Sequence, residues 1–217
     1  MKNPPKLKQK LEVKKHHGIE IKDEYSWIHQ KNILEVLKDS SKLNPEVKKY
    51  LEEENAYTEF NMKDTEQSQK KLFKEIKGRI KLDDESLHFF HNKEGWEYWT
   101  KTTANNNYPI QLRKKIGDSN DKAQEIWNGD KEKKKLNASY FGVGDLSVSH
   151  DHSLLGYSLD LNGSEFYTIY IRRIADEKII DQKIENTSGG ITFSKDSRFI
   201  FYTLLNENHQ PKKVFRH

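Results

Sequence analysis

The sequence contains no cysteine, which excludes a disulfide framework, a thiol nucleophile, thiolate zinc sites and iron–sulfur ligation. It also lacks any apolar run of about 18 residues, the length that predicts a membrane-spanning helix. The opening segment, Met1–Pro5, is followed by lysines and has no apolar core of a secretory signal. We therefore expect a soluble, cytoplasmic protein without a membrane partner.

Apolar residues are scarce as well. Hydrophobic residues make up 33% of the 217 positions and charged residues another 33%, but aromatic residues reach 11% and the formal net charge is only +4. Disordered chains combine few apolar and aromatic residues with a high net charge. This chain has more aromatic residues and a lower net charge than such chains. The composition predicts a folded protein with a thin core.

The positive charge is concentrated at the N-terminus. Residues 1–15 hold six lysines against one glutamate, and the remaining 202 residues carry 32 basic and 33 acidic groups. Arginine, whose fork-shaped guanidinium reads base edges, occurs only six times. We therefore expect no nucleic-acid partner. A second lysine run, Lys131–Lys135, is interpreted as a solvated loop.

Residues 1–78 predict an N-terminal helical extension. The first forty or so residues are interpreted as irregular, and a short helix is expected over Ile33–Lys38. Asn44-Pro45 is typical of a helix start, with Asn as the N-cap and Pro at the first helical position. Apolar residues then recur at helical spacing on one face, at Val47, Tyr50, Leu51 and Tyr57.

A second long helix is expected to begin at Thr65 and to end at Gly78, a residue type common at helix C-termini. Its apolar anchors are predicted to be Leu72, Phe73 and Ile76. The two long helices are predicted to pack on each other.

Residues 79–217 have a different texture. Short segments rich in aromatic and β-branched residues alternate with clusters of Asn, Gly, Asp and Lys. The segments that predict strands are Trp96–Thr100, Tyr108–Leu112 and Phe166–Ile171, and those that predict hairpin turns are Asn105–Asn107 and Asn162-Gly163. The pattern favours antiparallel β-structure throughout this part.

This β-rich part contains a repeat. Ser149–Tyr157 aligns with Ser194–Tyr202 at an offset of 45 residues, and a looser copy aligns Tyr108–Arg113 with Tyr167–Arg172 at an offset of 59. A period near 45 with several strands per unit is typical of a β-propeller, whose ring closes with about four to eight blades. Residues 79–217 therefore predict an incomplete propeller of about two and a half blades, so the fold class is mainly β with an N-terminal α-helical extension.

The glycine- and serine-containing motifs do not support a catalytic serine or a nucleotide-binding site. The sequence has no Gly-x-Ser-x-Gly nucleophile elbow. Ser188-Gly189-Gly190 directly precedes an expected strand and is interpreted as a turn. Gly142-Val143-Gly144 lacks the third glycine and the helix of a dinucleotide-binding loop, and it is also interpreted as structural.

Metal chemistry finds no support either. His150 and His152 flank Asp151, and His88 and His91 flank two phenylalanines, but neither pair has a visible third ligand. The repeat aligns His150 and His152 with residues of an equivalent turn, so both are expected to be exposed. The acidic run Asp83-Asp84-Glu85 is interpreted as a polar link between helix and propeller. We therefore predict no catalytic, cofactor-binding or metal-binding residue, and no cofactor.

Several collinear segments resemble the N-terminal region of the oligopeptidase B branch of the prolyl oligopeptidase family of serine peptidases. They span nearly the whole chain, and the most specific contain ENAYT, EIKGRI and ENTSGG in this order. The segments are Asp23–Trp27, Pro45–Thr58, Leu72–Asp84, Tyr108–Arg113, Ser139–Ile171 and Glu185–Gly190.

The resemblance implies a seven-bladed propeller that caps an α/β-hydrolase domain and excludes folded proteins. It also implies an N-terminal helical stretch that wraps the hydrolase domain, and cleavage of short peptides after basic residues. No residue of this chain corresponds to the family's Ser-Asp-His triad, so the chain alone is expected to be inactive. Short peptides are then its substrates only if another chain supplies the hydrolase domain.

Three hypotheses remain open from the sequence. In the first, the chain is the N-terminal propeller and cap portion of a serine oligopeptidase, either truncated or one half of a split gene. In the second, it is a non-catalytic protein-interaction module whose blades bind a partner. In the third, residues 1–15 bind nucleic acid through salt-sensitive contacts.

Overall fold

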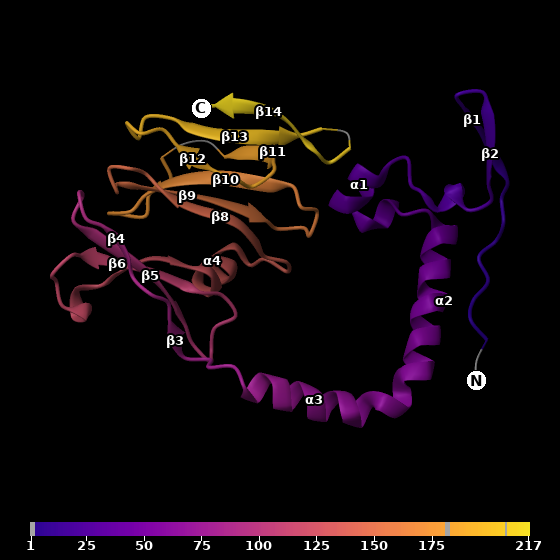
Figure 1. The fold of residues 1–217 in the computed structure, drawn as a ribbon, viewed down its shortest axis with the longest axis horizontal. Coiled ribbons are helices and arrows are strands. Elements are labelled where there is room, and N and C mark those ends of the chain that lie inside the picture. Colours follow the sequence, from indigo (N-terminus) through magenta and orange to yellow (C-terminus); the bar gives the residue numbers. More distant parts are fainter. Residues whose placement is uncertain (1–2, 181–182, 207) are drawn as a thin grey trace. The chain divides into compact units, whose positions relative to one another are not determined.

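The computed structural model describes residues 3–180, 183–206 and 208–217. The chain forms two compact units, Met1–Ile80 and Lys81–His217 (Figure 1). The first unit contains β1 (Glu12–His16), β2 (Ile19–Asp23), α1 (Ile33–Lys38), α2 (Pro45–Met62), α3 (Glu66–Gly78) and the short 3-10 helices η1 (Ser26–Ile28), η2 (Ser40–Lys42) and η3 (Lys63–Thr65).

The prediction that the N-terminal segment is irregular is wrong, because β1 and β2 pair as an antiparallel hairpin. The two residues between the strands, His17 and Gly18, both have positive φ, +50° and +83°, as a type I′ turn requires. All three apolar side chains that alternate along the hairpin, Val13, Ile19 and Ile21, are exposed. The hairpin therefore lacks the buried face that normally reveals a strand in a sequence.

Helix α2 begins where the sequence predicts. The Asn44 side chain accepts a hydrogen bond from the backbone N–H of Glu46 at 2.8 Å, and Pro45 occupies the first helical turn. Helix α3 begins after Thr65 and ends at Gly78, also as predicted. Val47 of α2 is the one apolar residue of this unit that is buried, among the residues that the structure describes.

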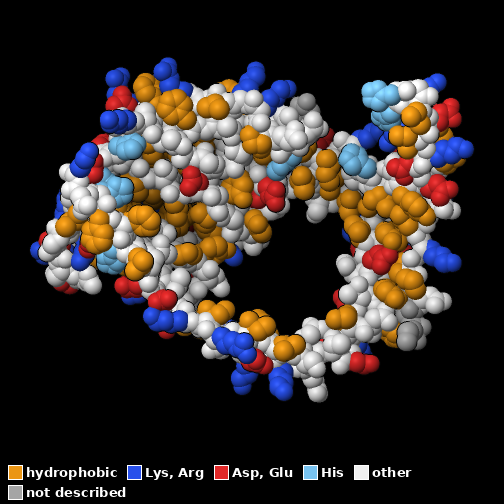
Figure 2. Space-filling model, in the orientation of Figure 1, with side chains coloured by type: hydrophobic (Ala, Val, Ile, Leu, Met, Phe, Trp, Pro, Cys, Tyr) orange, Lys and Arg blue, Asp and Glu red, His pale blue; other side chains and the backbone are white. Residues whose placement is uncertain are grey.

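The predicted packing of the two long helices is wrong. The expected apolar anchors of α3 are exposed: Leu72 is 55% exposed, Phe73 68% and Ile76 59%. Helix η3 joins α2 to α3 without leaving helical backbone angles, so the chain does not turn back and α3 cannot lie along α2. Figure 2 shows hydrophobic side chains lying open along these helices.

The described residues of the second unit form antiparallel strands, an α-helix of about two turns and a short 3-10 helix. Its elements are β3 (Asp84–Glu85), β4 (Phe89–His91), β5 (Trp96–Thr102), β6 (Ile110–Lys115), the 3-10 helix η4 (Asn120–Lys122), β7 (Gln124–Asn128), α4 (Gly129–Leu136), β8 (Gly142–Val148), β9 (Leu154–Asp160), β10 (Tyr167–Arg173), β11 (Ile184–Thr187), β12 (Thr192–Phe193), β13 (Ile200–Leu205) and β14 (Pro211–Arg216). The predicted strands and the turns between them are present.

These strands form successive blades. The first blade has the strand order β3-β5-β6-β7, with β4 also pairing with β5. The second blade is the four-stranded meander β8-β9-β10-β11, and the third begins with β12-β13-β14. Strands β11 and β13 link the second and third blades edge to edge through the residue pair Thr187 and Leu204. The fold is thus mainly β with an N-terminal helical extension, and its β part is a partial propeller, as predicted.

The 45-residue repeat corresponds to two equivalent turns, one before β9 and one before β13. In each turn the serine hydroxyl donates to the following aspartate at 2.6 Å, from Ser149 to Asp151 and from Ser194 to Asp196. The same two serine side chains accept backbone N–H groups five residues later, at 2.9 and 3.0 Å. Shared turn chemistry therefore explains why Ser-x-Asp recurs.

Two apolar interfaces hold the blades together. Because side chains alternate across a strand, Leu155, Tyr157 and Leu159 of β9 share one face, and they pack with Trp127 of the first blade. The opposite face of the second blade packs against the third through Ile169, Ile171, Ile191, Phe193 and Ile200. A Cβ on Gly156 would lie 3.2 Å from three of those side chains, so a glycine there permits the close approach.

The lysine run Lys131–Lys135 is not a solvated loop but part of helix α4. The Asn128 side chain caps this helix by accepting from the Lys131 N–H at 3.2 Å. Glu132 lies on the buried face of α4 and pairs with Arg172 of β10 at 2.7 Å. In the sequence, Glu132 is flanked by lysines, so its burial could not be predicted. No helix in the described part of the chain is long and apolar enough to span a membrane.

Candidate functional site

A cleft of about 570 Å³ lies between the first two blades. Strand β5 and the hairpin between β4 and β5 line one side, and β8, β9 and the turn between them line the other. The indole Nε1 of Trp99, a buried residue that lines the cleft, has no hydrogen-bond partner. Other lining residues are Tyr98, Gln111, Ile126, Leu146, Ser149 and Leu155, together with three ionisable residues at the rim, His91, Glu94 and His152.

His91 and Glu94 come from one tight hairpin between β4 and β5. The carbonyl oxygen of His91 accepts from the N–H groups of Glu94 at 3.2 Å and of Gly95 at 2.9 Å. Gly95 has φ +71°, a left-handed conformation that favours glycine. His91 pairs with Trp96 across the hairpin. The turn thus places an imidazole and a carboxylate beside each other, and both residues are exposed.

His152 comes from the turn between β8 and β9 and is only 6% exposed. Its φ of +61° is left-handed, and its N–H donates to the Ser149 carbonyl at 2.9 Å. Its own carbonyl accepts from Nη1 of Arg113 in the first blade at 2.6 Å. The prediction that His150 and His152 are both exposed therefore holds for His150 and is wrong for His152. Packing against another blade, which the repeat does not reveal, buries the latter.

The His152 ring is fixed by aromatic neighbours of the first blade. Its Nδ1 lies 2.7 Å from the Tyr98 hydroxyl, and the two rings stack with centroids 5.7 Å apart. The Trp96 ring stacks on it at 6.1 Å, and the His91 ring meets it edge-on at 5.1 Å. Burial, and secondly the charge of His91, lowers the pKa of His152, which favours the neutral imidazole at neutral pH.

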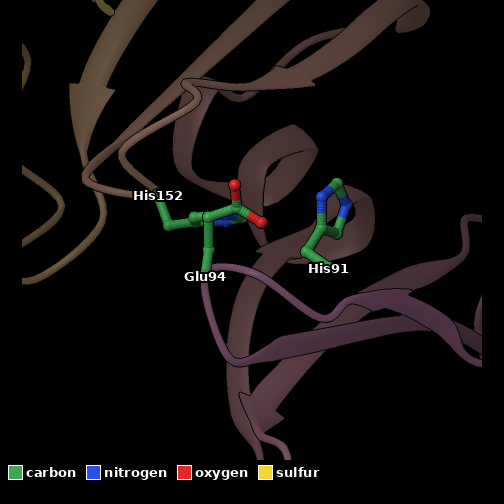
Figure 3. Close-up of side chains that lie close together, drawn as sticks. All are labelled: His91, Glu94 and His152. Atoms are coloured by element: carbon green, nitrogen blue, oxygen red, sulfur yellow. The ribbon is translucent and has the colours of Figure 1, made fainter.

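His91, Glu94 and His152 come together at the rim of the cleft. One possible ligand atom from each lies within 4.8 Å of the other two. Figure 3 shows the Glu94 and His152 side chains converging from two different segments, with the His91 ring beside them. Sequence reasoning found no third ligand for either histidine pair, whereas the fold joins one member of each pair to Glu94. The local signal was His-x-x-Glu around a hairpin, which is weak without the third residue.

The other candidate segments have structural positions. Gly142-Val143-Gly144 begins strand β8 with a register shift opposite β9. Gly189 has φ +95°, and its carbonyl accepts from the Ser158 hydroxyl at 2.7 Å. The Ser188 N–H donates to the Thr203 carbonyl at 3.0 Å. The glycine segments therefore support the blades.

The interpretation of the acidic run as a link between helix and propeller is wrong for Asp84 and Glu85, because these two residues form β3 of the first blade. Asp83 accepts from the Ala104 N–H at 3.0 Å, and Asp84 pairs with Lys81 at 2.6 Å. Glu85 lies 3.5 Å from Lys101 of β5. These carboxylates hold the first strand of the blade in place.

Antiparallel blades that stack through apolar faces, preceded by helices, define the class as a β-propeller with an N-terminal helical extension. The family described as prolyl oligopeptidase, N-terminal β-propeller domain, matches residues 4–217. The chain belongs to this family.

Two curated relatives are peptidases by name. The chain is 32% identical to dipeptidyl aminopeptidase BI of Pseudoxanthomonas mexicana over 92% of its length, and 25% identical to Protease 2 of Moraxella lacunata over 93%. It spans only 28% of each of these relatives.

Two solved structures of oligopeptidase B share the fold. The protein from Leishmania major superimposes with a TM-score of 0.82 at 22% identity, covering 99% of this chain and 31% of that protein. The protein from Trypanosoma brucei, with covalently bound antipain, gives a TM-score of 0.80 at 20% identity, with 99% and 30% covered.

Proposed function

We propose that this chain contributes the helical extension and the first propeller blades of a serine oligopeptidase, and that the blades limit the size of the peptides that reach its catalytic centre. The observation that carries the proposal is the family match over residues 4–217. The names of both curated relatives, a dipeptidyl aminopeptidase and a protease, support peptide hydrolysis. The partners are then short peptides and a peptidase domain that holds the catalytic triad.

Exposed apolar surface supports a role within a larger assembly. In α3, the apolar side chains at Leu72, Phe73 and Ile76 are exposed, and the hydrophobic residues Phe201 and Val214 of the third blade are exposed too. Large apolar surfaces left open in one unit are typical of contacts with another. A peptidase domain against α3 and further blades beside the third would cover them.

For specificity, we propose cleavage after basic residues. The resemblance to the oligopeptidase B branch and the Protease 2 relative support it. A second candidate is the release of N-terminal dipeptides, which the higher identity to dipeptidyl aminopeptidase BI favours, at 32% against 25%. The two activities differ in one requirement, because a dipeptidyl aminopeptidase needs a free substrate N-terminus.

A chimaera tests the proposal. Residues 4–217 replace the matching part of the M. lacunata Protease 2, and the product is assayed with chromogenic peptides that end in Arg or Ala, each with a free or a blocked N-terminus. Compared with unaltered Protease 2, the chimaera should cleave the blocked Arg peptide equally well under the first candidate and should cleave only the unblocked peptides under the second. Retained cleavage of short peptides with poor cleavage of a long unfolded polypeptide supports the size limit.

The chain by itself is the matched control. We expect no turnover of the Arg peptide by the purified chain alone. Turnover that persists through further purification would show that the chain carries its own catalytic residues. A well-folded chimaera that cleaves long and short substrates equally would contradict the role of the blades in limiting size.

A further inference from the structure

We propose that His91, Glu94 and His152 bind one divalent cation of the zinc class, and that the ion joins the first blade to the second. The three residues each offer one ligand atom within 4.8 Å of the other two. Two come from the β4–β5 hairpin and the third from the turn between β8 and β9. The site thus connects segments about 60 residues apart in sequence.

The geometry requires only a small adjustment. Ligands of one zinc ion lie about 2.0–2.2 Å from it, and therefore about 3.4 Å from one another in a tetrahedral site. Ligand atoms that lie within 4.8 Å of one another must therefore approach by at most about 1.4 Å. His91 and Glu94 are both exposed, so their side chains are free to make this change, and the buried His152 provides the fixed point.

The hydrogen bond and ring contacts around His152 resemble those that orient a metal-binding histidine. A histidine that binds a metal usually engages its other ring nitrogen in a hydrogen bond that fixes the ring. Here the Tyr98 hydroxyl lies 2.7 Å from Nδ1, which leaves Nε2 for the ion. Arg113 Nη1 donates to the same hydroxyl oxygen at 3.4 Å and uses one of its two lone pairs, so the second lone pair can accept from Nδ1–H of His152. Tyr98 is therefore a positioning residue.

Two cationic side chains lie near this site, and both have partners other than the three proposed ligand atoms. Arg113 donates to the His152 carbonyl at 2.6 Å and to Gln124 at 2.9 Å. The Lys115 ammonium lies over the Trp96 ring, 3.9 Å from its centroid. Glu94 supplies the negative charge that a divalent cation needs, and two imidazoles with one carboxylate leave a fourth position for water. This ligand set suits Zn²⁺, Co²⁺ or Ni²⁺ better than Ca²⁺ or Mg²⁺.

The test is titration of the metal-free, untagged full chain with zinc chloride by isothermal calorimetry. We expect one ion per chain, a rise in the unfolding temperature with zinc, and visible absorption bands when cobalt chloride replaces zinc. His91→Gln and Glu94→Gln should each weaken zinc binding at least tenfold and abolish the cobalt bands. Tyr98→Phe should weaken binding by about tenfold with the stoichiometry unchanged.

Two controls separate this site from other histidines. His150→Gln changes an exposed histidine two residues from His152 and should bind zinc as the unchanged protein does. The double variant His16→Gln/His17→Gln removes the exposed histidines of the N-terminal hairpin and should also bind normally. Circular dichroism shows whether each variant is folded.

Three outcomes would overturn the proposal. One is the absence of saturable zinc binding at one ion per chain. Another is unchanged affinity in folded His91→Gln and Glu94→Gln proteins. The third is loss of binding in His16→Gln/His17→Gln, which would assign the ion to the N-terminal hairpin.

Discussion

The blades and the helical extension differ in how much apolar surface each buries within its own unit. Among the described residues, the unit Lys81–His217 contains thirteen buried hydrophobic residues, whereas Met1–Ile80 contains only Val47. The blades are defined by packing between sheets. The helices are defined by local signals such as the Asn44 cap, and their apolar faces remain open. Regular secondary structure thus forms in both units, but only one of them supplies its own core.

The largest expected effect comes from the interface between the first two blades. Trp127 is 2% exposed and meets Tyr157 with ring centroids 4.7 Å apart, so Trp127→Ala should lower the free energy of unfolding by about 3–5 kcal/mol. The matched variant Phe73→Ala, in the exposed face of α3, should change it by no more than about 0.5 kcal/mol. Urea titration followed by circular dichroism measures both. Equal losses would remove the distinction between the two units.

A slightly smaller effect is expected at the buried ion pair of α4. Glu132→Ala leaves the Arg172 guanidinium without its partner in the interior and should cost about 3 kcal/mol in the same titration. Lys131→Ala breaks an exposed pair with Glu125 and should cost less than about 1 kcal/mol. The double variant Glu132→Leu/Arg172→Met should be more stable than Glu132→Ala. If Glu132→Ala matched Lys131→Ala, the pair would not be buried in solution.

The blade interface should also show a dependence on high pH. Burial raises the pKa of Tyr157 to about 12, so the folded state keeps this proton after an unfolded tyrosine, with a pKa of about 10, has lost it. The free energy of unfolding should therefore fall as pH rises from 10 towards 12, by about 1 kcal/mol at pH 11. The decline should be shallower in Tyr157→Phe. Parallel pH profiles for the two proteins would contradict this assignment.

The smallest effect is expected in the extension. Asn44→Ala removes the cap of α2 and should destabilise that helix locally by about 1 kcal/mol, whereas Asn44→Ser should be nearly neutral. Amide hydrogen exchange in the first turns of α2 should accelerate, with no change in β9 or β10. Acceleration in the blades as well would show that the two units unfold together.

Features that depend on nearby residues were predictable from the sequence. The Asn44-Pro45 helix start and the Gly78 helix end depend on neighbouring residues alone. The turns at Ser149 and Ser194 repeat the same side-chain bonds, so an alignment of the sequence with itself revealed the blades.

Features that depend on distant contacts were not predictable. His152 is buried because Tyr98 and Arg113 of another blade cover it. Glu132 is buried because Arg172, 40 residues later, faces α4. For the same reason the group formed by His91, Glu94 and His152 could not be found by spacing, since its third member comes from a different turn.

Hydrogen–deuterium exchange of the purified chain, resolved by segment, tests most directly whether only the blades supply their own core. We expect amides of β9 and β10 to be strongly protected, because both strands are paired on both sides and packed between two blades. Amides of α3 should exchange within seconds to minutes, because no residue of this helix is buried. Protection of α3 equal to that of β9 would contradict the account.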